Sequence, residues 1–235
     1  MNFVNRFQGI FFNPQLIFKS LSEKPVWVDA LIILLIAMMA FSYIILPYSQ
    51  QDNLQMMKNN IKLKERMGEE RFNQMIERLE NPSKTGIFLR SFLMAPVTAL
   101  IGFLFSSLIL LGLGRFLSTE GNYIKVFSAY LHANFIDKIL GNGLRLILIL
   151  TRKSAMQTTT SLALFFPQLE VTSAGFVILS QLDFFQLWLF GIFGYALSHI
   201  FKIELKKALF VSYGFWLIKS LFYITLGLIS LRYIG

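Results

Sequence analysis

Five long apolar stretches limit what this chain can fold into more than any other feature of its sequence. They run from about Val26 to Tyr48, Phe88 to Gly114, Tyr123 to Leu150, Asp183 to Phe201 and Ala208 to Leu231. A helix needs about 20 mostly apolar residues to cross a hydrocarbon layer of roughly 30 Å. Because 55% of the residues are hydrophobic and only 15% are charged, the sequence predicts an all-α membrane protein with about five transmembrane helices.

Prolines and glycines mark where these helices are expected to end or bend. The first stretch is expected to close near Pro47, and a kink is expected at Pro96 inside the second. The third stretch is unusually polar and meets Gly141-Asn142-Gly143, which predicts a break followed by an interfacial or re-entrant segment. The last two stretches are joined by the short basic segment 202–207 and are expected to form an antiparallel hairpin. The structure of residues 141–182 is not predicted.

Residues 1–25 have the pattern of an amphipathic helix that lies in the membrane interface. The segment combines Arg6 with several spaced apolar side chains and is expected to be interrupted at Asn13-Pro14. Its apolar members are Phe3, Phe7, Ile10, Phe11 and Phe12. The chain is therefore divided into an interfacial segment, residues 1–25, and a membrane domain, residues 26–235.

Residues 49–87 form a charged insertion in that domain, with seven basic and six acidic residues. Apolar residues recur there at steps of three and four, which predicts an extramembrane amphipathic helix whose apolar stripe is interrupted at Lys64 and Gly68. This candidate interaction helix carries the apolar stripe Leu54, Met57, Ile61, Phe72, Ile76 and Leu79. The intrinsic helix propensity of its residues alone does not keep an isolated helix folded in water. The partner of the stripe is therefore either another copy of the chain or the membrane surface. Because the charges of the insertion nearly balance, we favour a protein contact, in a homodimer or with another membrane protein.

The basic residues of the short loops predict the orientation, because Lys and Arg collect on the cytoplasmic side. With the N-terminus inside, the inner side collects Arg6, Lys19, Lys24, Arg115, Lys125, Lys202, Lys206 and Lys207. The outer side collects Arg152, Lys153 and Arg232. Leaving aside the nearly neutral insertion, the sequence predicts a cytoplasmic N-terminus and an external C-terminus.

Ionisable residues inside the apolar stretches are candidates for function, because each costs at least about 2.5 to 3.5 kcal/mol at the bilayer centre. The candidate intramembrane polar site consists of His132, Asp137, Lys138 and Lys219. Counted along helices from the inner side, Asp137 lies about 21 Å deep and Lys219 about 17 Å deep. The two could form a structural ion pair, line a path for protons, ions or headgroups, or remain apart with Lys219 reaching the interface.

Several classes of function are not expected. The chain has no cysteine and only two histidines, and no metal-ligand spacing or catalytic arrangement can be placed. We therefore expect no catalytic residues, no metal site and no cofactor. The formal charge of +9 is spread through loops and helix ends, which favours membrane lipids as partners and not nucleic acid.

Short motifs in order along the chain resemble bacterial Yip1-domain membrane proteins. The first motif precedes the first helix and consists of Asn13-Pro14, Phe18 and Pro25-Val26-Trp27. The third helix begins with Gly121 to Ser128, and the fourth begins with Asp183-Phe184-Phe185-Gln186-Leu187-Trp188. The last hairpin contains Lys206-Lys207-Ala208 and then Trp216. The resemblance implies a five-helix fold in a membrane, here the bacterial inner membrane, with the N-terminus in the cytosol. Eukaryotic relatives associate with Rab-type GTPases, but their Asp-Leu-Tyr-Gly-Pro motif is absent here, so GTPase binding is not carried over.

The function expected from these features is non-enzymatic. The chain is predicted to organise lipids or partner proteins through its N-terminal segment and its charged insertion. The alternative is a transporter or lipid scramblase that uses polar residues of the third and fifth helices. Transport should depend on Asp137 and Lys219, whereas organisation should depend on the exposed segments.

Overall fold

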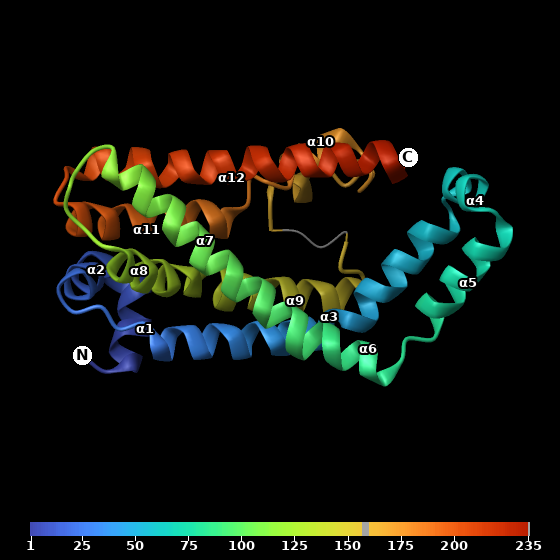
Figure 1. Cartoon of the computed structure of the whole chain (residues 1–235), viewed down its shortest axis with the longest axis horizontal. Helices are drawn as coiled ribbons and strands as arrows, with labels where there is room; N and C mark the ends of the chain where they lie inside the picture. The colour runs from blue at the N-terminus through green and yellow to red at the C-terminus, as the bar shows by residue number, and fades with distance from the viewer. Residues whose placement is uncertain (157–159, 235) are drawn as a thin grey trace. The chain divides into compact units, whose positions relative to one another are not determined.

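A computed structural model describes residues 1–156 and 160–234 of the chain (Figure 1). Within these residues the named elements are all helices. They divide into two compact units. Unit 1 comprises Met1–Met38, Pro96–Gly143 and Phe184–Ser220, and unit 2 comprises Met39–Ala95, Leu144–Asp183 and Leu221–Gly235.

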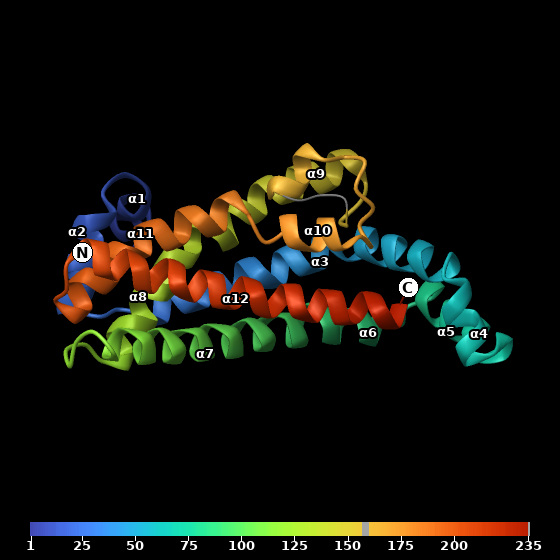
Figure 2. The same ribbon diagram turned by 90° about the horizontal axis from the view of Figure 1, so that it is seen from above.

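Unit 1 is built around α8, in which every residue from Val126 to Phe135 is buried. Helices α1 and α2 and the N-terminal part of α3 pack with it, together with α7, the π-helical turn η2, α11 and much of α12 (Figures 1 and 2). The bounds are α1 Phe3–Phe12, α2 Pro14–Glu23, α3 Val28–Lys58, α7 Ala95–Arg115, α8 Tyr123–Phe135, η2 Ile136–Gly141, α11 Phe184–Phe201 and α12 Leu205–Ile234.

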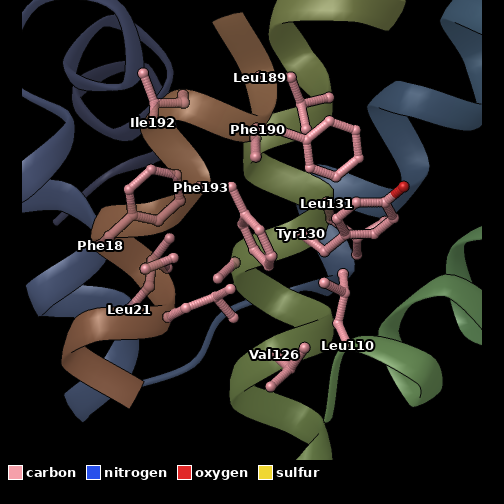
Figure 3. Close-up of a cluster of buried hydrophobic side chains, with 14 of the residues drawn as sticks. Phe18, Leu21, Leu110, Val126, Tyr130, Leu131, Leu189, Phe190, Ile192 and Phe193 are labelled. Atoms are coloured by element: carbon pink, nitrogen blue, oxygen red, sulfur yellow. The ribbon is translucent and has the colours of Figure 1, made fainter. Parts of the chain in front are cut away.

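The turn between α1 and α2 lies at Asn13-Pro14, as the sequence predicts. The Asn13 side chain accepts a hydrogen bond from the Leu16 amide, and Pro14 occupies the first turn of α2, where a missing N–H costs nothing. Helix α2 then packs along α11 and α8, and Phe18 and Leu21 face Phe193 in the core (Figure 3). The N-terminal segment therefore contributes to the hydrophobic core of unit 1.

Close contact between α7 and α11 depends on glycine. A Cβ at Gly114 would overlap the Phe201 ring, so only a residue without a side chain allows this approach. Gly121, in the loop after α7, has φ +84° and would place a Cβ 2.9 Å from Ile200. Such a backbone conformation is strained for other residues. These two glycines hold the α7–α8 loop against the end of α11.

Unit 2 contains the charged insertion and the segment between α9 and α11. Its remaining elements are α4 Ile61–Met67, α5 Glu69–Glu80, α6 Lys84–Phe88, η1 Leu89–Met94, α9 Asn142–Arg152, η3 Leu162–Phe165 and α10 Ala174–Leu179. The insertion is helical, as the sequence predicts, but its apolar stripe is divided among α3, α4 and α5, and the predicted interruption at Gly68 is confirmed. Asn60 caps α4 through the Leu63 amide, and Gly68 has φ +82° and ends it.

The candidate interaction helix is correspondingly split. Leu54 and Met57 belong to α3, Ile61 to α4, and Phe72, Ile76 and Leu79 to α5. Phe72 is 6% exposed, whereas Ile61 is 71% exposed. Lys58 at the end of α3 pairs with Glu80 at the end of α5 at 2.5 Å. The chain itself therefore covers part of the stripe.

The first apolar helix continues beyond the predicted end at Pro47. Helix α3 runs through Pro47 to Lys58. A proline removes one backbone hydrogen bond and crowds the preceding turn, but the helical turns on both sides are retained. The predicted end at this proline is therefore wrong.

The third apolar stretch also remains helical where a break is predicted. The amide of Asn142 bonds the carbonyl of Asp137, five residues earlier, and this closes the π-helical turn η2. Helix α9 follows without a non-helical residue, so the glycines on either side of Asn142 are accommodated by a wider turn. The predicted break is wrong.

Among the described residues, four helices are long and apolar enough to cross a membrane: Val28–Lys58, Lys84–Arg115, Phe184–Phe201 and Leu205–Arg232. The helix from Tyr123 to Arg152 is more polar. In the second span the π-helical turn η1 ends two residues before Pro96, where the proline frees a carbonyl. Large apolar side chains stay exposed along these helices, as in helices that face lipid. The chain is an all-α, multi-pass integral membrane protein.

Candidate intramembrane polar site

The most interconnected polar group of unit 1 joins three helices around Arg6. Its guanidinium forms an ion pair with Asp29 at the start of α3, and its Nε donates to Nε2 of His132 on α8 at 3.3 Å. One Nη also donates to the Met1 carbonyl at 2.7 Å. Arg6 is 5% exposed and His132 is fully buried. We call Arg6, Asp29 and His132 the Arg6 cluster.

These hydrogen bonds define the protonation of His132. A guanidinium can only donate, so Nε2 of the imidazole must accept and carries no proton. Nδ1 lies 2.8 Å from the Ser128 carbonyl, which can only accept, so Nδ1 carries the proton. His132 is therefore neutral and connects the N-terminal helix to α8. The Ser128 hydroxyl extends the connection by donating to the Val26 carbonyl at 2.7 Å.

Asp137 and Lys138 lie together on the π-helical turn η2. The Lys138 ammonium is 2.7 Å from Oδ2 of Asp137, whose side chain is 1% exposed, whereas that of Lys138 is 28% exposed. π-Helical turns inside longer helices occur frequently at functional sites. The structure therefore brings two of the four predicted site residues into direct contact.

Polar groups of α8 and α7 lie on the same side of the domain. Tyr130 on α8 is buried, and Ser106 of α7 and the residues Asn134, Asp137 and Lys138 lie close enough to interact with its hydroxyl. The Asn134 amide also donates to the Tyr130 carbonyl at 2.8 Å. We call Ser106, Tyr130, Asn134, Asp137 and Lys138 the polar seam.

Lys219 lies between α12 and α11. Its ammonium donates to Oε1 of Gln186 at 2.7 Å and is 5.5 Å from the centre of the Phe190 ring. An amide oxygen and an aromatic face both stabilise a cation in an apolar environment. The predicted pair between Lys219 and Asp137 stays a prediction.

Sequence reasoning missed a further, largely buried ion pair, in unit 2. Nη2 of Arg145 on α9 lies 3.0 Å from Oδ2 of Asp183, which immediately precedes α11. The Thr160 hydroxyl accepts from Nε of Arg145 at 3.0 Å and donates to the same Asp183 oxygen at 2.5 Å. The signal available in the sequence was Asp183, an acid directly before an apolar stretch.

Asp52 is another residue that the sequence did not single out. Its Oδ2 accepts from the Ala155 amide at 2.6 Å, the Met156 amide at 2.9 Å and the Ser154 hydroxyl at 3.1 Å. Asp52 thereby ties the last part of α3 to the segment after α9.

No grouping of three metal-ligating side chains occurs within residues 1–156 and 160–234.

An open apolar groove of about 410 Å³ lies on α7 beside the start of α8. Its lining residues are Ile101, Leu104, Phe105, Leu108 and Tyr123. The Tyr123 hydroxyl donates to the Leu104 carbonyl at 3.1 Å, which fixes the ring at one side of the groove. Phe105 is 63% exposed, so the groove opens outward from the helices of unit 1.

The fold and these buried polar groups define a multi-pass helical membrane protein with a polar interior. More particularly, the chain belongs to the Yip1 domain family, because the Yip1 domain family model matches residues 9–227. The resemblance seen in the sequence motifs is thereby confirmed. No curated protein and no solved structure matches the chain.

Proposed function

We propose that this chain is a non-enzymatic membrane protein that organises lipids by holding an acyl chain in the groove on α7. The groove is the observation that supports the proposal. Its volume lies within the range of about 300 to 1,000 Å³ that is usual for small-molecule sites. The lining is apolar except for the Tyr123 hydroxyl, which is already bonded to the Leu104 carbonyl.

The surroundings of the groove favour an acyl chain as its occupant. Four of its lining residues lie on α7, within the apolar helix Lys84–Arg115 that is long enough to cross the bilayer. Water is absent from that layer, so the molecules that can fill an apolar groove there are lipid tails or other apolar segments. A fixed aromatic ring gives the groove a defined wall.

The proposal is tested with a phospholipid that carries a photoreactive group in its acyl chain. The purified full chain is reconstituted with this lipid, illuminated, and mapped by peptide mass spectrometry. We expect labelling to concentrate on residues 101–108 and on Tyr123. Leu104→Trp, which fills the groove, should lower that labelling several-fold.

A matched control is Leu217→Trp, which adds the same bulk to an exposed position on α12. It should leave labelling of the groove unchanged. Labelling spread evenly over all exposed apolar helices, or equal effects of the two tryptophan variants, would show that the groove does not select lipid.

A lipid scramblase or transporter is the second candidate function, and the polar seam favours it. Tyr130, Asn134 and the Asp137–Lys138 pair follow one another along α8 and η2 beside Ser106 of α7. Polar side chains of this kind line headgroup and ion paths in membranes. In proteoliposomes, Asp137→Asn should then abolish lipid exchange between leaflets; no exchange in the parent protein would remove this candidate.

The location that goes with the proposal is a bacterial inner membrane with the N-terminus in the cytoplasm. The charge of the short loops supports that orientation.

A homodimer or another membrane protein bound through Ile61 and its neighbours on α4 and α5 is a further element of the proposal. The high exposure of Ile61 supports such a contact.

A further inference from the structure

Three turns of unit 1 lie at one end of this unit. They connect α2 with α3, α7 with α8, and α11 with α12, and Figures 1 and 2 show them close together. Lys202 in the third turn pairs with Glu120 in the second at 3.1 Å. In the first turn, Trp27 contacts Phe127, near the start of α8, with ring centres 5.7 Å apart.

This end carries an excess of positive charge. The three turns and the helix ends beside them hold seven basic residues against four acidic ones, Glu23, Asp29, Glu120 and Glu204. We call the basic residues the basic end: Lys19, Lys24, Arg115, Lys125, Lys202, Lys206 and Lys207. Three of the acids are already engaged, because Asp29 pairs with Arg6, Glu120 pairs with Lys202 and Glu204 lies 4.0 Å from Lys207.

Four cations of the basic end are available to a partner. Lys19, Lys24, Lys125 and Lys206 form no ion pair with any residue that the structure describes. Lys19, Lys24 and Lys206 are exposed, and Lys125 is partly exposed. Arg115 has a different role, because it donates to the carbonyls of Thr119 and Gly121 and shapes the α7–α8 loop.

The same loop presents apolar side chains beside these cations. Phe116 is 86% exposed and Leu117 is 45% exposed. Aromatic and aliphatic side chains next to lysines are typical of a surface that enters the headgroup region of a bilayer. Tyr123, which lines the groove on α7, begins α8 directly after this loop.

We infer that the basic end binds the headgroups of anionic phospholipids, so that the lipid organised by this chain is acidic. Lysines without ion-pair partners attract anionic headgroups more strongly than zwitterionic ones. The inference rests on the proposed lipid-organising function and names its lipid class. The nearly neutral insertion, residues 49–87, lacks this excess charge.

The test is native mass spectrometry of the full chain after incubation with equal amounts of phosphatidylglycerol and phosphatidylcholine of identical acyl chains. The parent should retain mainly phosphatidylglycerol. The quadruple variant Lys19→Gln, Lys24→Gln, Lys125→Gln, Lys206→Gln should lower the preference for phosphatidylglycerol at least about tenfold. The control removes as many charges from the insertion, by Lys64→Gln, Arg71→Gln, Arg78→Gln and Lys84→Gln, and should change the preference less than about twofold.

The outcomes separate this inference from the proposed function. Retention of both lipids in equal amounts by the parent, or equal losses in the two quadruple variants, overturns the acidic headgroup site and leaves lipid binding intact. Retention of neither lipid overturns both. A salt titration of the unaltered chain is an independent check, because exposed charges are screened within about 3 Å at 1 M salt. A preference that high salt leaves unchanged would also contradict the inference.

Discussion

The charges of the Arg6 cluster in unit 1 and those of α4 and α5 in unit 2 occupy opposite environments. In unit 1, Arg6 is nearly completely buried and bonds to Asp29, His132 and the Met1 carbonyl. In unit 2, Lys64 and Glu69 pair at 2.7 Å with side chains that are 46% and 73% exposed. Pairs of opposite charge therefore have very different consequences for stability in the two places.

Burial decides the difference. A buried charge that loses its partner stays desolvated and uncompensated, whereas an exposed charge that loses its partner returns to water. Removing one member of the Arg6 cluster should therefore disturb three helices. Removing one member of an exposed pair should disturb only the local helix end.

Arg6→Met is expected to have the largest effect on stability. It leaves the Asp29 carboxylate and Nε2 of His132 without their shared donor, and the loss should be about 3 kcal/mol or more in the free energy of unfolding. Unfolding in detergent, followed by circular dichroism, measures it. Lys19→Met on the neighbouring helix α2 is the control, since Lys19 is exposed. Equal stability of the two variants would mean that the cluster does not hold α1 in place.

Asp137→Asn is expected to cost about 1 to 3 kcal/mol, because it leaves a neighbouring cation uncompensated in a medium of low dielectric constant. Double variants with Lys138→Met and with Lys219→Met identify that cation. Recovery of stability in the first double variant would assign the pair to Lys138, which lies 2.7 Å away. Recovery in the second would assign it to Lys219, and simple additivity in both would show that neither cation is coupled to Asp137.

Phe72→Ala should have an intermediate effect, limited to α4 and α5. Phe72 is buried within the single chain, and truncation of a buried Phe costs about 3 to 5 kcal/mol in a full core. The two short helices α4 and α5 bury less apolar surface than a full core, so the loss of stability should stay local. We therefore expect faster proteolysis of residues 61–80 with little change in global unfolding. Slow proteolysis at the parent rate would show that Phe72 does not hold these helices together.

The homodimer is tested separately through single cysteines at Leu54 and Leu79 in a chain that has no cysteine of its own. A dimer through the stripe predicts cross-linking between copies, which replacement of Phe72 and Ile76 by Glu should abolish. If the single-cysteine chains without the Glu substitutions do not cross-link, the homodimer is excluded, and the stripe is covered by its own chain.

The smallest effect is expected at Glu69. A hydrogen bond and the charge of Lys64 lower the pKa of Glu69 below its ordinary value of 4.5. A carboxyl whose pKa is lower in the folded state stabilises that state above its ordinary pKa and loses this contribution as the pH falls through the folded value. The free energy of unfolding of Glu69→Gln should therefore match that of the parent at low pH and differ from it only slightly near neutral pH. A large difference at neutral pH would contradict the view that exposed charge pairs contribute little to stability.

The sequence predicted those parts of the fold that depend on apolar length. The helices at 88–114, 183–201 and 208–231 were found within a few residues, because each has a long apolar run and a clear polar boundary. The helix end predicted at Pro47 and the break predicted at Gly141 were wrong. A long helix can continue through a proline, and a π-helical turn can accommodate glycines beside it. In the insertion the interruption at Gly68 was predicted, but the break at Asn60 was missed, because a single polar residue that caps a helix gives no signal in the apolar periodicity.

The polar interior was less predictable, because chain order carries no distances. His132, Asp137 and Lys138 were singled out since ionisable groups in apolar stretches are costly. Arg6, however, is 126 positions from His132, and only the packing of α1 against α8 brings them together. Arg145 and Asp183 are likewise joined by a loop fold that no periodicity indicates.

The most direct measurement of the central claim is the side of the membrane on which the basic end lies. Ser118 lies in the loop between α7 and α8, and Ser118→Cys would be the only cysteine in the chain. A maleimide that cannot cross membranes should label this cysteine in opened membranes but not in intact cells, because the basic end is expected to face the anionic cytoplasmic leaflet. Labelling in intact cells would place the basic end outside and contradict the account.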